Sequence, residues 1–317
     1  MGSDPLSLVL TAYLAMAVVM VGLWVLQLRV RNASIADVGW CAGLIAVVLW
    51  YATQVTGDTE RKMLVAALAV LYAGRLGFYI LLNRVIGKTE DARYRRLREQ
   101  WGSSERLKMF GYFQLQALAV AAFSLPFLVL IHNPRPSFAL IELVGLLIWI
   151  VAVSGEAMAD RQLAQFRSKS WNHDRVCCDG LWRYSRHPNY FFEWLHWWAY
   201  VIMGVSAPGW LLTWIGPIGM GWALLKVTGI PWTERQALAS RERTIEPTNG
   251  RRTRSSHGFL GARSECRRAC YRDPCSYQLA GQLVSLPDPE TESAWHAMSH
   301  QSFGFPTRHR VRSTTGQ

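Results

Sequence analysis

Long apolar runs follow one another with short charged breaks from Leu6 to about Trp232, whereas no such run lies between Arg241 and Gln317. An α-helix needs roughly 20 mainly apolar residues to cross the hydrocarbon core of a bilayer. The runs therefore predict about seven membrane spans of this length, at roughly 6–28, 38–55, 63–83, 112–131, 137–157, 189–205 and 208–230. We expect an all-α, polytopic transmembrane helical bundle with a disordered polar C-terminal tail.

The first apolar run, from Leu6 to Val30, could in principle be a signal peptide. It is longer than the apolar region of a signal peptide, and neither a basic segment before it nor a small-residue cleavage site after it is evident. We therefore interpret it as a retained first span.

The distribution of basic residues distinguishes between membrane and nucleic-acid roles. The formal net charge is +12, which alone is typical of a nucleic-acid-binding protein. However, the lysines and arginines lie between the apolar runs and in the tail, with eight in 84–108 and six in 161–186, against two, one and none in 56–62, 132–136 and 206–208. By the positive-inside rule, the two basic loops face the cytoplasm. This orientation places the N-terminus outside and the C-terminus in the cytoplasm, and nucleic acid is not an expected partner.

Neither a metal site nor a disulfide framework is expected from the cysteines. The six residues are Cys41, Cys177, Cys178, Cys266, Cys270 and Cys275. Their spacing lacks the paired C-x-x-C pattern of a structural zinc site.

The most informative motif is Arg186-His187-Pro188-Asn189-Tyr190, with Glu193 three residues later. It lies where a basic loop enters a predicted span. Arg186 stays charged and suits a phosphate or a carboxylate, and Pro188 is tolerated in the first turn of a helix. From the residues alone, a basic membrane-border sequence with an N-terminal proline is an equally good interpretation.

Five segments in order along the chain carry a resemblance to a known family. They are Ser34 to Trp40, Asp91 to Tyr94, Glu156 to Arg167, Arg186 to Glu193 and Gly229 to Glu234. Together they resemble the steroid 5-alpha reductase and sterol reductase superfamily, in particular its poorly characterised bacterial branch with a steroid-5-alpha-reductase-like C-terminal domain. The resemblance covers nearly all of 1–240. It implies a multi-pass protein, expected in a bacterial inner membrane, with NADPH bound in a cytoplasmic pocket between the helices.

The resemblance also implies roles for individual side chains. Arg167, Arg186 and His187 would hold phosphate groups, which fixed positive charge and paired donors bind well. Asn189 and Tyr190 would bond the nicotinamide or ribose end of NADPH. The acceptors for ribose hydroxyls or amides would be Asp160 and Glu193, with Glu156 and Gln162 as weaker candidates.

The implied reaction is hydride transfer from NADPH to a carbon–carbon double bond of a lipid-like or steroid-like enone, followed by protonation. Tyr94 or Asp37 would act as the acid that polarises the carbonyl. Ionisable residues inside a membrane are functional candidates by default, which adds Arg75 and Asp91 to Asp37. For Arg75, a structural ion pair with an acidic residue is an equally good interpretation.

Two other functions stay open at this point. An isoprenylcysteine-type methyltransferase has a related helical core and a similar Arg-His-Pro-x-Tyr motif, but it uses S-adenosylmethionine. Asn189 and the segment around Asp160 favour the reductase. The third possibility is a non-catalytic membrane protein that lost its activity with its native C-terminus.

The resemblance ends at Arg241. Members of the branch continue with Glu-Asp-Tyr-Arg-x-Tyr-Gln-Arg-Thr-Thr, which closes the cofactor pocket. Codons read one base out of step across 242–259 permit that ending. We therefore predict that 1–240 is a reductase-like domain and that a frameshift near 241–243 produced the basic tail 241–317. The alternative is a genuine disordered extension, because the tail is rich in Arg, Ser, Thr, Gly and Pro, and resequencing of the gene distinguishes the two.

Overall fold

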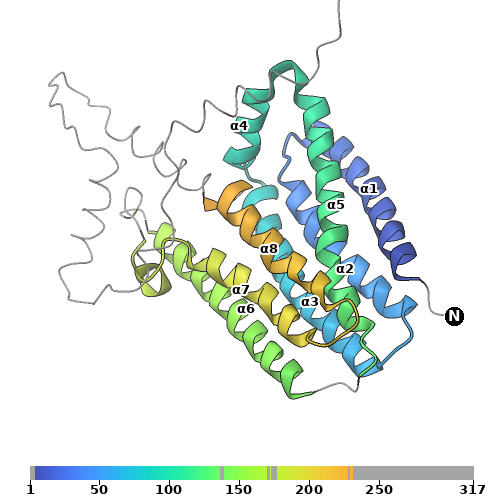
Figure 1. Cartoon of the computed structure of the whole chain (residues 1–317). Helices are drawn as coiled ribbons and strands as arrows, with labels where there is room; N and C mark the ends of the chain where they lie inside the picture. Colours follow the sequence, from blue (N-terminus) through green and yellow to red (C-terminus); the bar gives the residue numbers. More distant parts are fainter. Residues whose placement is uncertain (1–3, 136–138, 170–171, 173–176, 228, 231–317) are drawn as a thin grey trace, which may run out of the picture. The chain divides into compact units, whose positions relative to one another are not determined.

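The computed structural model describes residues 4–135, 139–169, 172, 177–227 and 229–230, and this part of the chain is helical without strands (Figure 1). The α-helices are α1 Pro5–Val30, α2 Ile35–Gln54, α3 Thr59–Ile80, α4 Ala92–Trp101, α5 Glu105–Ile131, α6 Leu140–Arg167, α7 Pro188–Met203 and α8 Ile215–Trp222. A π-helix, Leu81–Val85, continues α3. The predicted tail 241–317, and with it the domain boundary at 240, lies outside the described residues.

Five of the helical segments are long and apolar enough to cross a membrane. They are α1, α2, α3 with its π-helical extension, α4 with α5, and α6. The predicted all-α membrane bundle is thus confirmed. The predicted run 189–205 forms α7, which has 16 residues. The predicted run 208–230 is divided, with eight residues in α8 and a π-helix, Ala223–Val227, continuing it. At 1.5 Å per residue, α7 is about 24 Å long, which is less than the roughly 30 Å of the hydrocarbon core.

Aspartate side chains begin three of the helices by accepting hydrogen bonds from otherwise unpaired backbone N–H groups. Asp4 accepts from Ser7 N at 3.1 Å, and Asp58 accepts from Arg61 N at 3.0 Å. Asp91 does the same for α4. Pro188 opens α7 at the first helical position, as the sequence predicts.

Glycines allow α6 to lie directly along α7, which Figure 1 shows beside it. A Cβ atom at Gly145 would lie 2.8 Å from the backbone oxygen of Ala199. A Cβ atom at Gly155 would lie 2.5 Å from the ring of Phe192. Small residues of this kind let membrane helices approach closely and pack by dispersion contacts. The α6–α7 pair is therefore a closely packed unit that carries most of the predicted site residues.

Arg61 at the start of α3 connects three parts of the bundle. Its Nε donates to Glu142 Oε1 of α6 at 2.9 Å, and its Nη1 donates to Asn133 O, just after α5, at 2.8 Å. The Arg61 and Glu142 side chains are both nearly inaccessible to solvent, at 3% and 4% exposed. The pair therefore joins α3 to α6 at the opposite end of α3 from the candidate site described next.

Candidate functional site

Arg75 of α3 brings together acidic residues of α6 in the interior of the bundle. Its Nη1 donates to Asp160 Oδ2 at 3.2 Å, and its Nη2 is paired with Glu156 Oε1. Asp160 also accepts from Asn189 Nδ2 of α7 at 3.3 Å. Two of the predicted cofactor residues, Asp160 and Asn189, are thus in direct contact. The acidic partners expected for an arginine in a span are Glu156 and Asp160.

Glu193, another predicted cofactor residue, is buried on α7 and accepts a hydrogen bond from the hydroxyl of Tyr72 on α3. The ring of Tyr72 is stacked on the imidazole of His196, with ring centroids 3.8 Å apart. His196 Nδ1 lies 2.9 Å from the backbone oxygen of Glu193. The side chains from α3, α6 and α7 form a polar cluster inside an apolar bundle.

The loop before α7 is fixed on α6, and this contact positions the Arg186 motif. The backbone N–H of Leu181 donates to Gln162 Oε1 at 2.9 Å, and Trp182 Nε1 donates to Ala159 O at the same distance. Gly180 has φ +57°, and a Cβ atom there would lie 2.3 Å from the Gln162 amide. Gln162 therefore acts as an anchor for the loop, which needs glycine at 180.

The predicted phosphate-binding residues lie at the polar end of the α6–α7 pair. Arg167 is the last residue of α6 and is exposed, as is Arg186 in the loop. The His187 ring is stacked on Tyr190, with centroids 5.3 Å apart and the planes at 13°. In sequence, Arg167 lies about two turns of α6 beyond Asp160, and Arg186 lies just before Asn189.

The two predicted catalytic residues contact each other in a second polar cluster, built from α2, α4 and α5. Tyr94 OH donates to Asp37 Oδ1 at 2.7 Å, and Arg93 Nη2 donates to Asp37 Oδ2 at 2.9 Å. The hydroxyl of Tyr112 lies 3.2 Å from the hydroxyl of Tyr94. Gln116 Nε2 donates a hydrogen bond to the Tyr112 hydroxyl. Tyr94 is buried, so its hydroxyl depends on these partners.

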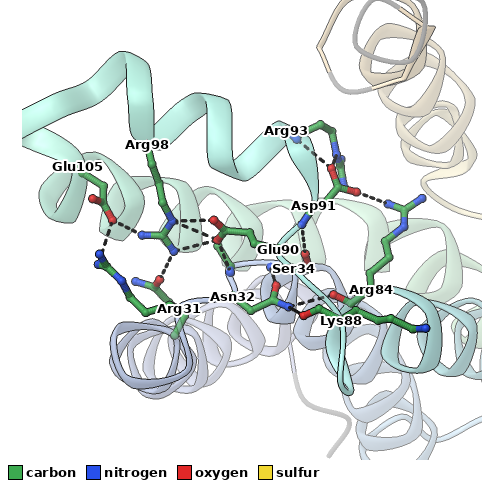
Figure 2. A network of polar contacts seen from close by, with 12 residues as sticks. Arg31, Asn32, Ser34, Arg84, Lys88, Glu90, Asp91, Arg93, Arg98 and Glu105 are labelled. Atoms are coloured by element: carbon green, nitrogen blue, oxygen red, sulfur yellow. Dashed lines mark hydrogen bonds and ion pairs between the residues drawn. The ribbon is translucent and has the colours of Figure 1, made fainter. Parts of the chain in front are cut away.

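Asp91 lies at the N-terminus of α4 between two arginines, as Figure 2 shows. Its carboxylate is 3.3 Å from Arg84 Nη1 and 3.3 Å from Arg93 Nε, and it accepts from Arg93 N at 2.9 Å. Burial alone would raise the pKa of Asp91. The charge and backbone N–H of Arg93, together with Arg84, outweigh burial and hold this pKa below its ordinary value.

The lowered pKa of Asp91 predicts a loss of stability in acid. A depressed folded-state pKa gives stability that is present above the unfolded value, about 3.9, and that is lost as pH falls through the folded value. We expect the acid limb of the unfolding temperature, measured in detergent between pH 3 and 6, to flatten in Asp91→Asn relative to the parent. An equally steep limb in the variant would contradict this assignment. Asp4→Asn is a useful control, because Asp4 caps α1 from an exposed position.

Tyr72 is a residue of the first cluster that the sequence analysis did not single out. It precedes Arg75 by three residues and so lies on the same face of α3. A tyrosine three residues from an arginine within an apolar run is the sequence signal that could have indicated Tyr72. Among the described residues, no group of three or more His, Cys, Asp or Glu side chains is arranged to hold a metal ion.

A comparison with protein families gives one match over these helices. The profile of a family described as "Protein of unknown function (DUF1295)" matches residues 23–246. The chain belongs to the DUF1295 family. This family is associated with steroid 5-alpha reductase-like proteins, which agrees with the coarse resemblance seen in the sequence. Searches of curated proteins and of solved structures gave no match.

The region matched to the DUF1295 family contains both polar clusters. The hydrogen-bonding groups of the first cluster can be compared with those of NADPH, the cofactor that the resemblance implies. Asn189 Oδ1 is buried and has no hydrogen-bond partner within the described ranges. A buried acceptor of this kind is costly unless a donor satisfies it. The amide and hydroxyl donors of a dinucleotide would satisfy this oxygen, and Arg167 and Arg186 supply positive charge at the polar end. The residues therefore fit the group that the resemblance implies.

Proposed function

We propose that this DUF1295 protein is a membrane-embedded, NADPH-dependent reductase of a carbon–carbon double bond in a lipid-like or steroid-like enone. The observation that carries the proposal is the contact of Asp160 with Asn189 and Arg75, in which residues of three helices bring the two predicted cofactor ligands together. The family association agrees with this class of chemistry.

The proposed binding site divides the cofactor between two environments. Arg167, Arg186 and His187 would hold its phosphates at the polar end, where fixed charge binds oxyanions. Asn189, Tyr190 and Glu193 would hold the nicotinamide and ribose by hydrogen bonds. When bound, NADPH would supply the hydride.

The chain's own residues would supply the acid. Tyr94 is the proposed group that polarises the substrate carbonyl. Its hydroxyl donates to Asp37 Oδ1 at 2.7 Å, and it would turn this hydrogen bond from Asp37 to the carbonyl oxygen when a substrate is bound. Arg93 in turn holds Asp37, so the orientation of the tyrosine is determined by a charged partner rather than by packing alone. The Tyr112 hydroxyl lies next in the hydrogen-bonded chain and would return a proton to Tyr94. Gln116 Nε2 donates to the Tyr112 hydroxyl and holds it in place.

Equilibrium binding of NADPH to purified protein in detergent tests the proposal. Because the tail is predicted to replace a segment that closes the pocket, we expect tighter binding by a frame-restored chain than by the chain with residues 241–317. In the restored chain, Arg186→Ala and Asn189→Ala should each weaken binding by about 10-fold or more, the scale of a hydrogen bond to a charged group.

Arg29→Ala is the matched control, because Arg29 is an exposed arginine near the end of α1. Its NADPH affinity should equal that of the parent. Tight binding of S-adenosylmethionine without binding of NADPH would instead favour the methyltransferase. Failure of the frame-restored chain to bind either nucleotide would remove the basis for an enzyme.

A further inference from the structure

A polar hollow of about 260 Å³ lies between the π-helical end of α3 and the start of α4. It adjoins the second cluster, because its lining residue Asp91 pairs with Arg93. Its lining combines charged, amide and hydroxyl side chains: Asn83, Arg84, Thr89, Glu90, Asp91 and Arg95. The π-helix Leu81–Val85 widens the last turn of α3 at this point, and such wide turns are frequent at functional sites.

The acidic part of the lining is held by neighbouring cations, as Figure 2 shows. Glu90 accepts from Arg98 Nε at 2.9 Å and from Ala33 N at 2.8 Å. Asp91 lies between Arg84 and Arg93. Both carboxylates are therefore already neutralised by arginines, and the shape of the hollow is fixed by these contacts before any ligand enters.

Basic side chains beside the hollow remain available. Arg95 is part of the lining, and Lys88 precedes Thr89 in sequence. Both are exposed, and neither has an ion pair within the described part of the chain. Since Glu90 and Asp91 are neutralised, these two charges make the rim attractive to an anion.

An apolar stripe leads to the hollow along α3 and its extension. Phe78, Leu82 and Ile86 are 63%, 43% and 57% exposed. Phe78 and Leu82 are four residues apart and lie on about one face of the helix, and Ile86 follows the last residue of the π-helix with an extended backbone. Because α3 is one of the five candidate spans, exposed apolar side chains on it face acyl chains. The hollow therefore lies at the level where acyl chains give way to headgroups.

We propose that this hollow binds the headgroup of an anionic phospholipid. The phosphodiester would be bound by Arg95 and Lys88, and the acyl chains would lie along Phe78, Leu82 and Ile86. Hydroxyl groups of a glycerol headgroup would donate to Glu90 or Asp91. The site combines positive charge, which attracts anionic headgroups, with an apolar surface beneath it for the acyl chains.

Native mass spectrometry of the full chain in detergent, titrated with phosphatidylglycerol or phosphatidylcholine, tests the proposal. The affinity for the first phosphatidylglycerol should exceed that for phosphatidylcholine. Removal of each basic residue should weaken the affinity for phosphatidylglycerol by about fivefold. Lys88→Gln with Arg95→Gln should therefore weaken phosphatidylglycerol binding by roughly 25-fold and leave the affinity for phosphatidylcholine unchanged.

The control removes two charges elsewhere, in Lys62→Gln with Arg135→Gln. Lys62 lies in the first turn of α3, at the end opposite the hollow, and Arg135 is an exposed residue shortly after α5. This variant should keep the phosphatidylglycerol preference. Equal affinities of the parent for the two lipids, or an unchanged preference in Lys88→Gln with Arg95→Gln, would overturn the proposal. Displacement of phosphatidylglycerol by equimolar glycerol 3-phosphate would also overturn it, since a soluble phosphoester would then be the ligand.

Discussion

Arg61→Met is expected to lower the free energy of unfolding by about 3–5 kcal/mol. The substitution removes the cation from a buried ion pair and leaves Glu142 charged among apolar groups. It also removes the donor to the Asn133 carbonyl. Reversible unfolding in mixed micelles measures the change.

The double variant Arg61→Met with Glu142→Met separates the cost of an unpaired charge from the cost of lost packing. Replacing both partners of a buried pair by apolar side chains is often close to neutral. We expect the double variant to recover much of the stability that the single variant loses. A double variant as unstable as the single one would show that Arg61 acts mainly through the backbone carbonyls after α5.

Arg75→Met is expected to destabilise the protein by about 3 kcal/mol, near the lower limit for breaking a buried pair. The estimate is lower than for Arg61 because the Arg75 side chain is 22% exposed, against 3%. The variant leaves Glu156 and Asp160 of α6 without their cation. If the proposed function is correct, it also weakens NADPH binding, because Asp160 loses the group that fixes its carboxylate.

Arg84→Met is the matched control for Arg75. It belongs to the extension of the same helix and pairs with Asp91, but its side chain is 38% exposed. Exposed pairs of this kind contribute about 0–1 kcal/mol, so its unfolding should change little. Equal destabilisation by Arg75→Met and Arg84→Met would show that burial does not determine the strength of these pairs.

The bundle could be predicted from the sequence because apolar runs and their charged breaks are local properties. The start of α7 at Pro188 follows from the restricted geometry of proline. The predicted run 208–230 is instead divided, since α8 covers Ile215–Trp222. The end of α7 at Met203 lies within two residues of the predicted limit at 205. Gly204 and Gly209 lie in the turn after it, and Gly209 adopts φ +77°. The hydropathy of the sequence does not indicate that the backbone turns at these glycines.

The candidate site was predictable as a set of residues and not as an arrangement. The resemblance indicated Asp160, Asn189 and Glu193, and the first two are in contact. The pairing of Arg75 with Glu156 joins segments about 80 residues apart, which no local pattern reveals. The Tyr72 contact with Glu193 spans 121 residues and requires the packed bundle.

The arginines of α3 also bear on how the bundle is made. Glu142 follows Arg61 by 81 residues, and Asp160 follows Arg75 by 85. During synthesis, α3 therefore leaves the ribosome well before α6 exists. An arginine at the centre of a span costs about 2.5–3.5 kcal/mol on insertion. We expect α3 to remain beside the translocon, or to sit shallowly in the bilayer, until α6 arrives with its carboxylates and completes the insertion of both.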